Sequence, residues 1–190
     1  MKVKDFFSLV KFSHTIFALP FAAIGFSLAI WYDGYAFDWY LLLYVLLCMI
    51  FARSAAMGFN RIVDSKFDAK NERTAPREIP AGVISKRAAL VFVILMSMLF
   101  VATTWFINRI CFYLSPVALG VILFYSYTKR FTPLCHLVLG IGQSLVPIGA
   151  YLAVSGQFAV TPIIFSLIVL GWMTGFDILY ALQDEEFDRK

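Results

Sequence analysis

Residues 39–68 read WYLLLYVLLCMIFARSAAMGFNRIVDSKFD, and this stretch decides the fold class. Up to Phe59 it contains one charged side chain, Arg53, and its length matches the ~20 apolar residues that cross a lipid bilayer as a helix. The first proline after it is Pro76, and prolines interrupt helices. We therefore predict a transmembrane helix that extends beyond its apolar part through Asp68 and then gives way to a folded loop.

The composition excludes an ordinary soluble domain. Hydrophobic residues make up 61% of the chain and charged residues 15%, whereas soluble domains average about 45–50% and about 25%. No segment alternates between apolar and polar residues in the way that the strands of a membrane barrel do. We expect an all-α, polytopic membrane helix bundle with six transmembrane helices. The six apolar stretches are Phe12–Tyr32, Trp39–Phe59, Ala88–Ile107, Ile110–Tyr127, Leu134–Val154 and Val160–Leu182.

The basic residues predict the orientation of these helices. Lys and Arg of short loops stay on the cytoplasmic side of a membrane, and here they gather before the first stretch, after the second, between the fourth and fifth, and after the sixth. We expect an integral membrane protein with a cytoplasmic N-terminus, whose polar segments after the second and sixth stretches meet at the cytoplasmic face. Because the net charge of +4 follows this topology, it does not indicate nucleic-acid binding.

Two polar triplets with the same four-residue spacing follow two of the apolar stretches. On a helix, each triplet occupies an arc of about 80°. Carboxylates spaced in this way repel each other unless a cation lies between them, and hard oxygen ligands suit Mg²⁺ that is bound together with a substrate phosphate. The pattern therefore indicates a diphosphate held by metal. The triplets are Asn60, Asp64 and Asp68, and Tyr180, Asp184 and Asp188.

Other polar residues have two interpretations each. Asp177 lies inside an apolar span, so it must face a cavity or a partner. Arg53 is either a snorkelling or structurally paired arginine, or the site that receives the carboxylate of an acceptor substrate. Basic residues near the triplets are expected from topology alone, but one or two of them can contact a diphosphate. These basic residues are Arg73, Arg77, Lys129 and Arg130.

Three segments resemble one family. The run from Arg53 to Gly82 resembles the first aspartate-rich motif of the UbiA superfamily of intramembrane prenyltransferases, and the run from Asp177 to Asp188 resembles the second. The segment YSYTKR at 125–130 is similar to the connection between the fourth and fifth helices of that family. The resemblance is greatest to the 4-hydroxybenzoate polyprenyltransferase type, including its relatives in menaquinone pathways.

The resemblance implies Mg²⁺-dependent transfer of a polyprenyl group from polyprenyl diphosphate to the ring of an aromatic acid, in ubiquinone or menaquinone biosynthesis at the bacterial inner membrane. It implies a catalytic set of five aspartates that binds Mg²⁺. All of them except Asp177 are expected to be direct metal ligands. The set is Asp64, Asp68, Asp177, Asp184 and Asp188. The implied substrate-binding residues are Arg53, Asn60, Arg73, Arg77, Lys129, Arg130 and Tyr180.

The family has nine transmembrane helices, so we expect residues 1–190 to form a single prenyltransferase domain without its C-terminal helices. Two other functions use similar residues. A membrane transporter or ion-binding protein also has intramembrane carboxylates, but they usually lie near the bilayer midplane. A membrane phosphotransferase uses aspartates and metal, but in one dense motif that contains glycine.

Overall fold

The computed structural model describes residues 3–10 and 17–184, and every regular element in these two ranges is helical. The all-α prediction is confirmed. The elements are α1 (Val3–Leu9), α2 (Leu19–Ser27) with its π-helical continuation Leu28–Tyr32, α3 (Trp39–Asp68), α4 (Lys86–Trp105), α5 (Arg109–Thr128), α6 (Cys135–Ser155), α7 (Val160–Ala181) and the 3₁₀ turn Leu182–Asp184.

In the part of the chain that the structure describes, five helices, α3 to α7, are long and apolar enough to cross a membrane, and a shorter apolar helix covers Leu19–Tyr32. This shorter helix corresponds to the first predicted stretch, of which residues 12–16 lie outside the described residues. The prediction that the second apolar stretch continues as a helix through Asp68 is confirmed, because α3 ends at Asp68. The fold is therefore a polytopic membrane bundle, as expected.

Side-chain caps fix where the long helices begin. The side chains of Asp38, Ser85 and Asn108 each accept a hydrogen bond from a backbone N–H two or three residues later, at the start of α3, α4 and α5. Such caps satisfy amide groups that have no partner within the helix. Gly156 ends α6 in the left-handed conformation, with φ of 65°, which glycine adopts without steric cost.

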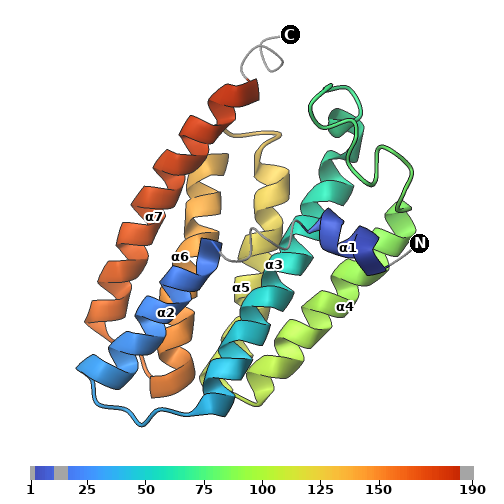
Figure 1. Ribbon diagram of the computed structural model, residues 1–190. Coiled ribbons are helices and arrows are strands. Elements are labelled where there is room, and N and C mark those ends of the chain that lie inside the picture. The colour runs from blue at the N-terminus through green and yellow to red at the C-terminus, as the bar shows by residue number, and fades with distance from the viewer. Residues whose placement is uncertain (1–2, 11–16, 185–190) are drawn as a thin grey trace.

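The helix ends that carry the predicted polar and basic residues lie at one end of the molecule (Figure 1). α6 packs against α7, α2 and α5, while α3 packs against α4 and α5. The C-terminal ends of α3, α5 and α7 lie at the same end as the long connection 69–85. The short connections before α3, α5 and α7 lie at the opposite end. This arrangement agrees with the prediction that the two polar segments meet at one face.

A short helix that the sequence analysis did not predict supports the long connection. α1 lies across α3 and α4 in Figure 1, and the Phe6 ring stacks on Phe92 of α4 with centroids 5.0 Å apart. Leu9 is fully buried in a cluster with Ile79 and Ile84. Through this cluster, α1 ties the connection 69–85 to the first turns of α4.

Large apolar side chains cover the outside of the bundle. Examples are Val91 and Met98 on α4 and Leu167 and Leu179 on α7, all of which are exposed. Apolar patches of this extent are rare on soluble monomers. They are expected where lipid tails surround the protein, so the exposed faces agree with an integral membrane protein.

Candidate active site

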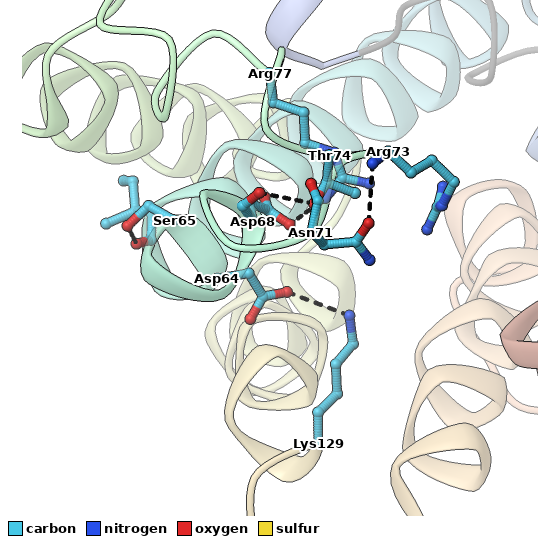
Figure 2. A network of polar contacts seen from close by, with 9 residues as sticks. Asp64, Ser65, Asp68, Asn71, Arg73, Thr74, Arg77 and Lys129 are labelled. Atoms are coloured by element: carbon cyan, nitrogen blue, oxygen red, sulfur yellow. Dashed lines mark hydrogen bonds and ion pairs between the residues drawn. The ribbon is translucent and has the colours of Figure 1, made fainter. Parts of the chain in front are cut away.

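The first polar triplet lies on the last turns of α3, where α5 ends beside it (Figure 2). Lys129, the residue after α5, donates a hydrogen bond from Nζ to Asp64 Oδ2 at 3.3 Å. Arg130 donates from Nη2 to the backbone oxygen of Val63 at 2.7 Å. Two predicted basic residues therefore hold the end of α5 against the acidic face of α3.

Asp68 is the buried member of the triplet, with 6% of its surface exposed. Its Oδ1 accepts a hydrogen bond from Arg77 Nη1 at 2.6 Å, and its backbone oxygen accepts one from the Thr74 hydroxyl at 3.0 Å. The connection after α3 thus folds back over the helix end. Asp68 Oδ2 is also buried but has no hydrogen-bond partner among the described residues.

The unpaired oxygen of Asp68 is suited to a cation or a hydrogen-bond donor. A buried carboxylate oxygen without a partner is costly, because it has lost its hydration and gained nothing in return. Mg²⁺ prefers such oxygen ligands, and it usually takes one or two carboxylates together with substrate phosphate. Asp64 lies one turn before Asp68 on the same face of α3. The residues at this end of α3 therefore fit a bound Mg²⁺.

Two deeper residues of α3 also have buried donors without partners. Asn60 Nδ2 and Arg53 Nε are both buried and unpaired in the described part of the chain. Arg53 forms no ion pair with a described carboxylate. Polar side chains therefore follow one another along α3, from Asp68 into the apolar part of the helix.

The two arginines of the connection 69–85 have different surroundings. Arg77 reaches Asp68, whereas Figure 2 shows the Arg73 side chain extending away from Asp68. The Arg73 backbone N–H donates to Asn71 Oδ1 at 2.9 Å, which shapes the turn between them. The connection therefore brings Arg77 into contact with Asp68 of the triplet, whereas the Arg73 side chain points away from Asp68.

The second polar segment begins with Asp177 on α7, and its partner is His136 of α6, a residue outside both polar segments. His136 Nδ1 lies 2.8 Å from Asp177 Oδ2. The signal that points to such a partner is Asp177 itself, because an aspartate inside an apolar span needs a polar neighbour. His136 lies in the first turn of α6, at the same end of the bundle as the first triplet.

The rest of the second segment is less completely described. Tyr180 is 44% exposed, and its ring stacks on Phe176 with centroids 6.4 Å apart. The backbone of Asp184 ends the 3₁₀ turn after α7, but its side chain lies outside the description. Asp188 is also outside the described residues. The predicted metal ligands Asp184 and Asp188 therefore remain predictions.

The connection between α5 and α6 links the two acidic segments. Lys129 at one end contacts Asp64, and His136 at the other contacts Asp177. The Tyr125 phenol lies close enough to interact electrostatically with both aspartates, and Lys129 Nζ lies 5.0 Å from the centre of its ring. Within residues 3–10 and 17–184, no three His, Cys, Asp or Glu side chains gather around one point that could hold a metal. The described residues thus form two acidic halves on either side of this connection.

Arg61 of α3 is a further buried residue near the site, which the sequence pattern did not single out. Arg61 is 4% exposed, its Nε has no described partner, and the charges of Asp64, Asp68 and Arg77 act on it. Its position could have revealed it, since residues three and seven before the two aspartates share their face of the helix. Arg61 is therefore a further buried cation on the same face of α3 as the two aspartates.

Comparison with known proteins shows which family this chain belongs to. The sequence profile of the UbiA prenyltransferase family matches residues 18–190. The 4-hydroxybenzoate octaprenyltransferase of Tolumonas auensis is 37% identical over 138 residues, which are 73% of this chain and 48% of that relative. This chain therefore spans about half the length of that relative.

Two solved structures have the same fold. The apo structure of a UbiA homolog from Aeropyrum pernix K1 has a TM-score of 0.83 and 33% identity, and the similarity covers 94% of this chain and 66% of that one. The structure of a UbiA homolog from Archaeoglobus fulgidus bound to GPP and Mg²⁺ has a TM-score of 0.74 and 22% identity, and it covers 97% of this chain and 65% of that one. With a family match over most of its residues, this chain belongs to the UbiA prenyltransferase family.

Proposed function

We propose that this protein transfers a polyprenyl group from a polyprenyl diphosphate to the ring of an aromatic acid of the 4-hydroxybenzoate type, with Mg²⁺ as cofactor. The observation that supports this most directly is Asp68, whose buried Oδ2 has no partner although its Oδ1 is bonded to Arg77. The relative from Tolumonas auensis and the homolog bound to GPP and Mg²⁺ support the same chemistry.

The diphosphate binds between the aspartates and the basic residues beside them. Lys129 and Arg77 each lie within hydrogen-bond distance of a carboxylate of the first triplet, so both are next to any phosphate that is held there. When bound, Mg²⁺ neutralises the charge of the leaving diphosphate. Arg73 and Arg130 extend the same basic surface, and Asn60 and Tyr180 complete the proposed substrate contacts.

The reaction breaks the bond between the allylic carbon and the diphosphate oxygen. Both bonding electrons leave with the diphosphate, and the allylic cation that remains is attacked by the acceptor ring, which then loses a proton. Basic side chains aimed at the leaving group stabilise the charge that develops there. The apolar faces of the bundle exclude water, which would otherwise capture the cation.

Arg53 receives the carboxylate of the acceptor in this proposal. Its guanidinium lies inside α3, has a buried Nε without a partner, and forms no ion pair with a described carboxylate. A guanidinium binds a carboxylate with two parallel hydrogen bonds, which fixes the orientation of the ring. The described residues of the two acidic segments lie at one end of the bundle, which does not favour a transporter site at the midplane.

The reaction takes place at the bacterial inner membrane, with both acidic segments on the cytoplasmic side. This orientation rests on the basic residues at the end of the bundle where the acidic segments lie. The product would enter quinone biosynthesis. The expectation that residues 1–190 form one prenyltransferase domain stays a prediction.

The experiment that tests the proposal measures the binding of geranyl diphosphate (GPP) to the purified protein, with Mg²⁺ and with EDTA. We expect binding to require Mg²⁺, because neither the aspartates nor the diphosphate is neutralised without it. Asp64→Ala should abolish this dependence, whereas Glu72→Ala, which removes an exposed carboxylate of the connection 69–85, should not. Equal binding in EDTA would refute the metal-dependent mechanism.

A further inference from the structure

We propose that His136 is a positioning residue, which holds the Asp177 carboxylate in the orientation that Mg²⁺-dependent binding of the prenyl diphosphate requires. The inference rests on the proposed function and adds to it a residue outside both aspartate-rich motifs. It comes from the contact between the first turn of α6 and the last turns of α7, where His136 Nδ1 and Asp177 Oδ2 are 2.8 Å apart.

The direction of this hydrogen bond follows from the chemistry of its two groups. An ionised carboxylate only accepts hydrogen bonds, so Nδ1 must bear the proton and donate it. Either the neutral imidazole protonated at Nδ1 or the imidazolium satisfies this condition. The side chains of His136 and Asp177 are 26% and 19% exposed, so the contact is partly shielded from solvent.

The packing of α6 on α7 fixes this contact in place. Gly140 lies one turn after His136, and a Cβ at this position would lie 2.4 Å from Thr174 Oγ1 and 2.8 Å from the backbone oxygen of Leu170. The Thr174 hydroxyl in turn donates to that same backbone oxygen at 2.7 Å. The two helices therefore approach each other closely one turn from the pair, which leaves His136 and Asp177 little freedom to separate.

A carboxylate held through one oxygen presents its other oxygen in a defined direction. His136 occupies Oδ2 of Asp177, and Oδ1 has no hydrogen-bond partner among the residues described. Partners of this kind, which orient a group at a metal site without touching the metal, change metal affinity or activity by about tenfold to a hundredfold when they are removed. His136 therefore acts through Asp177, and its loss should affect Mg²⁺-dependent binding by a similar factor.

The test compares three substitutions of His136 in the full chain, with GPP and Mg²⁺ as the probes. In His136→Asn, the side-chain N–H lies near the position of Nδ1, so binding of GPP should stay close to that of the unmodified protein. In His136→Gln, the N–H lies near the position of Nε2, so binding should weaken about tenfold to a hundredfold, as in His136→Leu. Ser144→Ala is the control on the same helix, because this hydroxyl bonds only to the backbone of its own turn.

A double variant tests whether His136 acts through Asp177. If it does, His136→Gln combined with Asp177→Asn should bind GPP no more weakly than Asp177→Asn alone. The Mg²⁺ concentration at half-maximal GPP binding should rise in His136→Gln, which a purely structural role would not cause. Thermal unfolding of each variant shows whether the fold is intact.

Three outcomes would overturn the inference. If His136→Gln binds GPP as the unmodified protein does while Asp177→Asn binds it weakly, then Asp177 needs no orienting partner. If His136→Asn is as weak as His136→Gln, then packing of the imidazole is what matters. If the unmodified protein shows no Mg²⁺-dependent binding of GPP, the proposed function fails and this inference fails with it.

Discussion

Arg77 and Asp68 form an ion pair of 2.6 Å across the turn that leaves α3, and only one oxygen of Asp68 takes part in it. The pair closes the connection 69–85 over the helix end. It also places a guanidinium directly beside a carboxylate oxygen that has no partner.

Replacing Arg77 should therefore destabilise the protein in a way that Mg²⁺ corrects. Arg77→Ala leaves the buried Asp68 carboxylate without its cation, and we expect a loss of about 1–3 kcal/mol in the free energy of unfolding. Because Mg²⁺ supplies the missing charge, its addition should raise the Tm of Arg77→Ala more than that of the unmodified protein. Thermal unfolding in detergent, with and without Mg²⁺, measures both effects. An equal Mg²⁺ response of the two proteins would argue against a metal at Asp68.

Lys129 is expected to contribute to binding and little to stability. Its side chain is 38% exposed, and an exposed ion pair such as that with Asp64 is worth about 0–1 kcal/mol. A diphosphate adds a second negative partner, so Lys129→Gln should weaken GPP binding about tenfold while the Tm changes little. Arg109→Gln is the matched control, since Arg109 is an exposed cation at the opposite end of α5. If both variants weaken binding equally, the effect is one of net charge.

Arg53 should distinguish the acceptor from the prenyl donor. Arg53→Ala removes a contact to the acceptor carboxylate only, so the KM for 4-hydroxybenzoate should rise far more than the KM for the prenyl diphosphate. Arg53→Lys should recover little of this loss, because an ammonium group cannot form two parallel hydrogen bonds. Steady-state kinetics with each substrate varied in turn gives both constants. Equal increases for the two substrates would place Arg53 elsewhere in the mechanism.

α1 is expected to control the mobility of the connection 69–85. Leu9 is fully buried against Ile79 and Ile84, and truncating a buried leucine to alanine costs about 2–5 kcal/mol in a packed core. Because this cluster involves the connection, Leu9→Ala should accelerate amide hydrogen exchange at 69–85 and weaken GPP binding. Val91→Ala, which shortens an exposed side chain on α4, serves as the control. Unchanged exchange in Leu9→Ala would show that the connection is held without α1.

The sequence predicts the helices well because each depends on a local pattern. Apolar runs of membrane-spanning length identify α3 to α7, and the absence of a proline before Pro76 predicts that α3 continues through Asp68. The seven residues of α1 are too few to give such a pattern. Their burial depends on Ile79 and Ile84, which lie far along the chain.

The contacts of the site were predictable only as far as one helix determines them. The common face of Asp64 and Asp68 follows from helical geometry. The partner of Asp68 is nine residues away through an irregular turn, so spacing alone did not select Arg77. The partner of Asp177 depends on how closely α6 and α7 pack, which the absence of a side chain at Gly140 permits. An isolated glycine in an apolar run does not reveal which helix it faces.

The turn between α5 and α6 has a length that the protein cannot easily change. Surface loops usually tolerate insertions, but here Lys129 before the turn and His136 after it are each bonded to a different helix. Adding one residue at Pro133 would lengthen this turn and shift Lys129 and His136 relative to each other. Either His136 would then lose Asp177, or Lys129 would lose Asp64. Substitutions within this turn should therefore be far better tolerated than insertions or deletions, although it is exposed to solvent.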